Sequence, residues 1–430
     1  MNYASPIIIT LLGLQLAAFL LLVLLRQIFK NLSEKITISI VTSTIFFSIF
    51  LISALIFFTL HNPQHPQIID IGTWFGIENM KYEIVFIIDA LSLTYSLFAM
   101  TMISLVAIFS RRYLHKENGF HRFYIFMLLF ALGANIISFA GTMEIIIIGW
   151  EFVGLSSILL IAFFNYRAGP VKNSFWVFVN YRICDIGLFA AVLVLHAFEH
   201  SSNFQMLENA NWLGVSSHQA PLILGFLILF AAMGKSALFP FSNWLQRAME
   251  GPTPSSAIFY GAISIHFGPL LLLRSADLIA NMPALKISVI LIGLTTALFA
   301  RIISHGQSDV KSMLAYSSVA QVGLIVAEIG LGFNMLALLH IIGHSSFRTL
   351  QMLRAPSIIH DLRNIEQLLG HSLLPINLQK KHGKFDYFIY RFILERGYMD
   401  NILQKIIGLF LKPFYAIDRL EKKWSNFLSR

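Results

Sequence analysis

The residue best suited to moving a proton is Lys235, which lies in the apolar stretch AAMGKSALFPFSNW five residues before Pro240. A proline inside a helix removes one backbone hydrogen bond and clashes with the carbonyl four residues earlier, here that of Ser236. The helix is therefore predicted to break beside the lysine. Backbone groups that are freed at membrane depth must be satisfied by protein or water. A lysine beside hydrated backbone can exchange protons, which we favour over a purely structural role.

Two acidic residues of another apolar stretch could supply the partner. Glu151 stands in the middle of IIIIGWEFVGLSS, and Glu144 lies seven residues earlier on the same face of the predicted helix. An ionisable group inside a membrane is costly unless it is paired or hydrated, so each is a candidate functional residue. Arg182 and Asp185, at i and i+3 in NYRICD, can neutralise each other locally. A structural and a functional role are equally open for that pair.

Histidines extend the set of titratable groups. His266 lies three residues before Pro269 in SIHFGP, and the kink beside it favours a function over simple packing. In LHIIGHSSFRTLQMLRAP, His340, His344 and Arg348 fall at i, i+4 and i+8, on one stripe of a helix. Two histidines at that spacing could bind a metal, but no Glu or Cys accompanies them. We therefore favour a line of titratable groups over a metal site, because histidine changes charge near physiological pH.

The remaining candidate is Lys311, which ends the loop RIISHGQSDVK and either reaches the membrane interface or joins the same path. The chain has one cysteine, Cys184, which excludes an internal disulfide and CxxC-type haem, zinc or iron–sulfur sites. P-loop and HExxH motifs are also missing from the sequence. We therefore expect no cofactor or metal bound by this chain, and a proton path in place of a catalytic triad.

Apolar segments long enough to span a bilayer must position these residues. Hydrophobic residues make up 57% of the 430 and charged residues only 12%, too few to cover a soluble surface. We predict an all-α polytopic membrane protein with eleven transmembrane helices, of which the seventh is broken by proline. The predicted spans are 6–28, 36–60, 84–110, 122–140, 143–164, 173–198, 220–247, 254–275, 285–304, 312–332 and 334–355.

Charge in the loops gives an orientation. KNLSEK, RRYLHKENGFHR, NYRAGPVK and RIISHGQSDVK fall on one side, whereas residues 61–83 have one Lys against three acids and residues 199–219 have no Lys or Arg. The loop 274–286, with Arg274 and Lys286, is an exception. By the positive-inside rule the N-terminus lies outside and the tail lies in the cytoplasm. The net charge of +9 is thereby explained without a nucleic-acid partner.

The chain divides into three regions. Residues 1–80 are expected to supply N-terminal transmembrane helices, and residues 81–355 the transmembrane core that carries the candidate site. Residues 356–430 interleave aromatic and basic residues at helical spacing, which predicts amphipathic helices on a membrane surface or on a partner.

Four motifs carry a family resemblance: FIIDALSLTY, GWEFVGLSS, GKSALFPFSNWLQRAMEGPTPSSA and DVKSMLAYSSVAQVG. They resemble the proton-translocating, antiporter-like subunits of respiratory complex I and Mrp antiporters, the NuoL and MrpA type, over about residues 80–355. The resemblance implies that Glu151 and Lys235 form the central proton-handling pair. It also implies that Lys311 matches the next family lysine and that His340 and His344 match paired histidines of the eleventh helix.

The chain departs from that family pattern at several places. Arg348 replaces a family lysine and can hold charge but cannot release its proton. Tyr260 replaces a histidine, and His266 is new. No predicted span follows residue 355, so we expect the second broken helix to be missing and the inverted repeat to be truncated.

Two further segments, FYGAISIHFGPLLLLR and FRTLQMLRAPSIIHDL, look most like DabB, the membrane subunit of an inorganic-carbon accumulation system in the bacterial inner membrane. The resemblance implies that cation flow energises CO₂ hydration. The cation would be the proton, with Na⁺ as the alternative. That chemistry would occur in a DabA-like zinc protein on the cytoplasmic face, and this chain would not be an enzyme.

Two other functions stay open. A proton-translocating component of a complex I-like or Mrp-type antiporter would explain the shared motifs. A quinone-linked membrane oxidoreductase belongs to another class, and it is disfavoured because the sequence contains no haem, flavin or iron–sulfur ligand set.

Overall fold

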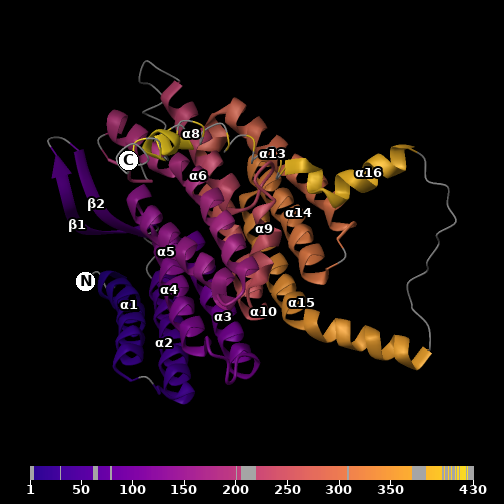
Figure 1. The fold of residues 1–430 in the computed structure, drawn as a ribbon. Coiled ribbons are helices and arrows are strands. Elements are labelled where there is room, and N and C mark those ends of the chain that lie inside the picture. The colour runs from indigo at the N-terminus through magenta and orange to yellow at the C-terminus, as the bar shows by residue number, and fades with distance from the viewer. Residues whose placement is uncertain are drawn as a thin grey trace.

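The computed structural model describes residues 4–29, 31–61, 66–77, 80–199, 201–204, 219–307, 309–369 and 384–399, with scattered positions up to residue 424. The predicted polytopic helical architecture is confirmed, because nine segments of this part of the chain are long and apolar enough to cross a bilayer. Eight of them are α1 (Ala4–Ile28), α2 (Glu34–His61), α3 (Ala90–Tyr113), α4 (Phe120–Phe139), α5 (Met143–Ile161), α6 (Ala168–Glu199), α13 (Pro283–Ser304) and α14 (Val310–Leu331). They pack side by side in one bundle (Figure 1).

A β-hairpin stands where the sequence predicted a loop and the start of the third span. Strand β1 (Gln67–Ile77) pairs with β2 (Met80–Ile88) in an antiparallel ladder beside the helices (Figure 1). A short apolar run such as residues 84–88 cannot be assigned to helix or strand from its pattern alone, which is why the prediction was wrong there. Helix α3 instead begins after Asp89, whose side chain accepts a 2.7 Å hydrogen bond from the Ser92 amide.

The seventh predicted span is broken beside its lysine, as the sequence indicated. Helix α8 (Gln219–Lys235) ends at Lys235, and α9 (Trp244–Arg247) follows after an irregular turn. The carbonyl of Gly234 at the break accepts a 2.9 Å hydrogen bond from the indole nitrogen of Trp244. Gly234 is required by close packing, because a Cβ atom at that position would lie 2.1 Å from the Cβ atom of Cys184.

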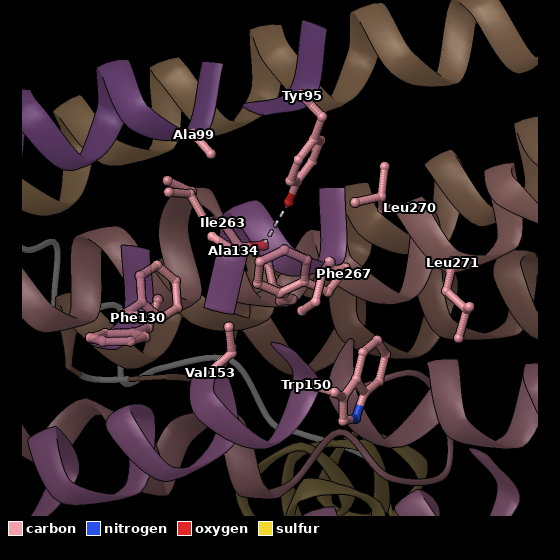
Figure 2. Packing of buried hydrophobic residues seen from close by; sticks show 14 of the residues in the cluster. Tyr95, Ala99, Phe130, Ala134, Trp150, Val153, Ile263, Phe267, Leu270 and Leu271 are labelled. Atoms are coloured by element: carbon pink, nitrogen blue, oxygen red, sulfur yellow. Dashed lines mark hydrogen bonds between the residues drawn. The ribbon is translucent and has the colours of Figure 1, made fainter. Parts of the chain in front are cut away.

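The eighth predicted span is also irregular. It consists of α10 (Thr253–Ser256), a π-helical turn (Ala257–Ala262), a 3₁₀ turn (Ser264–His266) and α11 (Phe267–Arg274). Between the two turns, the carbonyl of Ile263 accepts a 3.1 Å hydrogen bond from the Tyr95 hydroxyl inside the apolar core (Figure 2). A buried side chain thus satisfies a backbone group freed by the irregularity, as membrane depth requires. The short helix α12 (Ala276–Asn281) then leads to α13.

The last two helices differ from the sequence-based expectation in extent. Helix α15 (Asn334–Leu369) continues beyond the predicted span 334–355 and projects from the bundle (Figure 1). Helix α16 (Lys384–Leu394) carries aromatic and basic residues and packs against the end of α13, where the rings of Phe299 and Phe392 lie 6.4 Å apart.

The basic loops meet at one end of the bundle, which we call the basic face. Glu34 contacts His115 at 2.7 Å, and Arg122 donates to the Phe163 carbonyl at 2.5 Å. The C-terminal segment reaches the same face, because Arg396 lines a cavity of about 450 Å³ together with Lys311. The opposite end, which carries β1 and β2, is called the hairpin face. The division of the chain at residues 80 and 355 stays a prediction.

Candidate functional site

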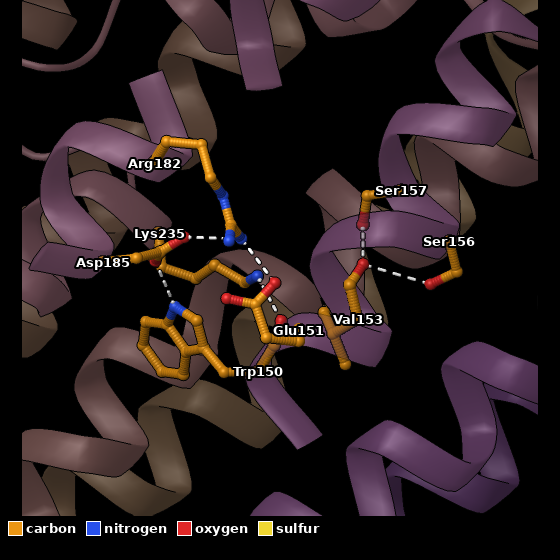
Figure 3. Close-up of polar contacts among 8 residues, drawn as sticks. All are labelled: Trp150, Glu151, Val153, Ser156, Ser157, Arg182, Asp185 and Lys235. Atoms are coloured by element: carbon orange, nitrogen blue, oxygen red, sulfur yellow. Dashed lines mark hydrogen bonds and ion pairs between the residues drawn. The ribbon is translucent and has the colours of Figure 1, made fainter. Parts of the chain in front are cut away.

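A charged cluster connects α5 and α6 about midway along the two helices. Arg182 donates to Glu151 at 2.5 Å and lies 2.9 Å from Asp185, so one guanidinium joins two carboxylates (Figure 3). The i, i+3 pair predicted from the sequence is therefore present, and Glu151 extends it. The indole of Trp150 donates to the other oxygen of Asp185 at 2.7 Å, which fixes the orientation of that carboxylate.

Lys235 lies at the same place, at the broken end of α8. Its side chain is 2% exposed, and Nζ donates a 3.0 Å hydrogen bond to the Trp150 carbonyl, one residue from Glu151 (Figure 3). The ammonium also lies 4.6 Å from the centre of the Tyr181 ring, at a cation–π distance. Trp150 thus contacts Lys235 through its carbonyl and Asp185 through its indole. The structure thus brings Glu151, Arg182, Asp185 and Lys235 into one cluster.

A row of buried hydroxyl groups leads away from the lysine. The Tyr181 hydroxyl is within reach of the hydroxyls of Tyr260 and Ser264. These three oxygens are buried, and none makes a well-formed hydrogen bond in the described part of the chain. An unsatisfied buried hydroxyl costs about 1 to 3 kcal/mol. These three hydroxyls are therefore polar groups inside an apolar core, and Ser264 lies two residues before His266 in the chain.

The histidines of the eighth and eleventh predicted spans meet in a second cluster. His266 lies 2.7 Å from the Ala262 carbonyl through Nδ1, and 3.2 Å from His344 Nδ1 through Nε2. A carbonyl only accepts, so Nδ1 of His266 holds a proton and its Nε2 accepts from His344. Nε2 of His344 is then the free acceptor; it is buried and makes no hydrogen bond to any described residue. The fixed direction of these bonds suits proton transfer between the two rings.

Arg348 lies beside this pair, buried and 6% exposed. It donates to Ser317 at 2.9 Å and to Gln351 at 2.8 Å, and it makes no ion pair with a carboxylate in the described residues. The position therefore holds a positive charge in polar but uncharged surroundings.

The other predicted site residues lie toward the two faces. His340 binds Glu328 at 2.9 Å and Gln321 at 3.1 Å, near the junction of α14 and α15. Its ring is 6.4 Å from that of His344, so the predicted histidine stripe is present. Lys311 lines the cavity at the basic face.

Glu144 forms a separate contact at the hairpin face. It lies 2.5 Å from His196 Nε2, near the end of α6, and also accepts from Ser202. His196 and Glu328 were not singled out from the sequence. Both lie inside predicted spans, so the rule that selected Glu144 and Glu151 as ionisable groups inside the membrane would have found them. Their pairing with residues far along the chain was not visible.

The fold agrees with what family comparisons show. The family model described as "NADH:quinone oxidoreductase/Mrp antiporter, TM" matches residues 140–374, more than half of the chain. A second model, "NADH-Ubiquinone oxidoreductase (complex I), chain 5 N-terminus", matches residues 74–124. The chain therefore belongs to the membrane family of NADH:quinone oxidoreductases and Mrp antiporters, and it is a multi-pass membrane protein.

Individual relatives are similar at moderate identity. NADH-ubiquinone oxidoreductase chain 5 of Pseudosoriculus fumidus is 32% identical, over 83% of this chain and 57% of the relative. The protein of the same name in Schizophyllum commune is 33% identical, over 70% and 44%. The chain thus spans about half the length of the curated relatives it matches.

Solved structures share the fold. A chain of the Mrp complex from Dietzia sp. DQ12-45-1b superposes with a TM-score of 0.68 at 22% identity, covering 86% of this chain and 38% of that one. A chain of the membrane-bound sulfane sulfur reductase, an archaeal respiratory membrane complex, gives 0.67 at 20% identity, over 85% and 72%.

Proposed function

We propose that this chain is a proton-conducting subunit of a membrane complex and that it energises a reaction carried out by a partner. The observation that carries the proposal is the position of Lys235, buried at a broken helix beside two carboxylates that share one arginine. An ammonium in that position can pass a proton and regain one when the neighbouring charges rearrange. Membership of a family whose relatives are named as complex I and Mrp subunits supports the same function.

The central cluster would work by exchanging partners. Arg182 keeps its proton, so it can only change which carboxylate it neutralises. A proton that arrives on Glu151 would release Arg182 toward Asp185, which would in turn reduce the attraction between Asp185 and Lys235. Lys235 would then lose its proton more readily. The proton would thus move because the ion pairs change partners, while Arg182 keeps its own charge throughout.

The route from Lys235 would follow the hydroxyl row to the histidine pair. Tyr181, Tyr260 and Ser264 offer unpaired hydroxyls along it, and ordered water bound to such groups can bridge proton transfers. His266 and His344 would carry the proton further. His340 with Glu328, and Lys311 at the basic face, would connect the path to the two sides.

The experiment that tests this function compares Glu151→Gln and Lys235→Ala with wild type. Gln keeps the shape of Glu but cannot ionise, and Ala removes the ammonium. We expect each to abolish proton flux into liposomes that contain the purified chain with its co-purifying partners, while insertion and assembly stay normal. Wild-type flux in either variant would refute the function.

We further propose that the reaction energised is inorganic-carbon accumulation. The DabB-like segments and the exchange of a family lysine for Arg348 support this. The position of α16 on the basic face supports it as well. In a bacterial inner membrane with the N-terminus outside, the basic face would be cytoplasmic. The partner would be a DabA-like zinc protein, and this chain would hold no cofactor. The alternative is a subunit of a complex I-like or Mrp-type antiporter, which the relatives favour.

Co-purification distinguishes these alternatives. The tagged chain would bring down a large soluble protein with about one bound zinc under the first, and several further membrane subunits under the second. Cells that depend on this system should then need Glu151 for growth at air-level CO₂.

A further inference from the structure

A buried acid–imidazole pair lies at the hairpin face, away from the central cluster. Glu144 is 9% exposed and His196 is 2% exposed, and Oε1 of Glu144 lies 2.5 Å from Nε2 of His196. Ser202 donates to the other carboxylate oxygen. Buried ionisable groups at membrane depth are costly and are kept where they serve a function.

Three segments are joined around this pair. The Gly141 amide donates to the Val85 carbonyl at 2.8 Å, and Phe204 donates to the Gly141 carbonyl at 3.0 Å. Strand β2 supplies the Tyr82 ring, which packs 4.4 Å from the His196 ring. A Cβ atom on Gly141 would lie 2.8 Å from the Val85 carbonyl oxygen, so only glycine lets β2 approach this closely. The hairpin, which no predicted function uses, thus covers the pair.

The imidazole has a second nitrogen for exchange. Nδ1 of His196 is buried and makes no hydrogen bond to the part of the chain that the structure describes. A histidine can take up a proton at one ring nitrogen and release another from the opposite one. Uptake at Nδ1 would let the proton on Nε2 pass to Oε1 of Glu144, with no other bond changed. The neighbouring titratable side chain from the covering strand is Tyr82.

The pair is aligned with the central cluster. Glu144 and Glu151 lie two turns apart on the same face of α5, about 10 Å along the axis. Both glutamates contact α6, through His196 and Arg182. We propose that Glu144 and His196 form the proton-loading site of the hairpin face, from which Glu151 is supplied through bound water. This inference rests on the proposed proton-conducting function.

The test uses substitutions that separate a proton-transfer role from a structural one. Glu144→Gln is isosteric and can keep hydrogen bonds to both neighbours, whereas Glu144→Asp keeps the acid but shortens the side chain. A loading site predicts that flux falls at least tenfold in Gln and is partly retained in Asp. A structural role predicts the reverse order, and that result would overturn the proposal.

His196→Gln should also lower flux at least tenfold and flatten its dependence on the pH of the hairpin-face compartment. The matched control is His115→Gln, which breaks the corresponding Glu34–His115 pair on the basic face, with an exposed histidine. It should leave both flux and pH profile unchanged. Wild-type flux with an unchanged pH profile in His196→Gln would overturn the proposal, and the Glu144→Gln and Glu144→Asp comparison decides it if His196→Gln does not fold.

Infrared difference spectra, recorded while the pH of the hairpin-face compartment is changed, do not depend on net transport. A carboxyl band that disappears in Glu144→Gln but persists in Glu151→Gln would identify the loading site even if the chain carried no net flux. A Glu144→Gln spectrum identical to wild type would refute the loading site. Equal flux in wild type and Glu151→Gln would refute the proposed function instead.

Discussion

Removal of Arg182 should expose the repulsion between the two carboxylates that it joins. Glu151 and Asp185 contact the same guanidinium nitrogen at 2.5 Å and 2.9 Å, so their oxygens are at most about 5.4 Å apart. At an effective dielectric constant of about 20, two like charges at that distance repel by about 3 kcal/mol. The side chains of Arg182 and Glu151 are 35% and 33% exposed, which reduces the effect to about 1 to 2 kcal/mol.

The Arg182→Gln variant should therefore lose stability at neutral pH, and a second substitution, Asp185→Asn, should restore about 1 to 2 kcal/mol of it. Asparagine removes one of the two charges and can still accept from Trp150 through its oxygen. The measurement is the free energy of unfolding in detergent micelles titrated with dodecyl sulfate, for the wild type, both single variants and the double variant.

Arg122→Gln is the control for this cycle, because Arg122 donates to the Phe163 carbonyl and has no carboxylate partner among the described residues. Its effect should add to that of Asp185→Asn without recovery. If the Arg182→Gln/Asp185→Asn double variant is no more stable than Arg182→Gln, the two carboxylates do not repel each other, and the switching of ion pairs proposed for the central cluster is wrong.

Two further outcomes are expected. His340→Ala and His344→Ala should each reduce proton flux because they interrupt the histidine line, and full flux in the double variant would remove that line from the path. Deletion of residues 384–430 should release the partner from the membrane fraction while the chain stays inserted, because α16 packs on the basic face. A partner that stays bound and active would show that the segment serves only as a membrane-surface helix.

The features predicted from the sequence are those that depend on near neighbours in the chain. The break at Lys235 follows from Pro240, five residues on, and the Arg182–Asp185 pair follows from helical spacing. Long apolar runs likewise give the spans, because a bilayer demands about 20 apolar residues from any helix that crosses it.

The features that were missed depend on residues that meet only in the folded chain. His266 and His344 are 78 positions apart, and Glu144 and His196 are 52 apart. No periodicity connects such pairs, because their contact is set by how whole helices pack. The hairpin was missed for a different reason, since the five apolar residues 84–88 at the end of β2 have no pattern that separates a strand from a helix.

Two arginines delimit the proposed path, and the second one provides a decisive test. Lys235, His266 and His344 can all release a proton, whereas Arg182 and Arg348 cannot. Arg348 is buried among Ser317 and Gln351, so its charge must act on the groups beside it, and His344 lies one helical turn earlier on α15.

If Arg348 supplies only fixed charge, Arg348→Lys should keep flux within about tenfold of wild type, because the charge remains although the planar fork is lost. Arg348→Gln keeps polar contacts but removes the charge, and it should reduce flux toward the level of Glu151→Gln. The measurement is proton flux into liposomes at equal amounts of inserted protein. Equal flux in the Lys and Gln variants would show that the position contributes hydrogen bonds alone, and the histidine pair would then work without a neighbouring positive charge.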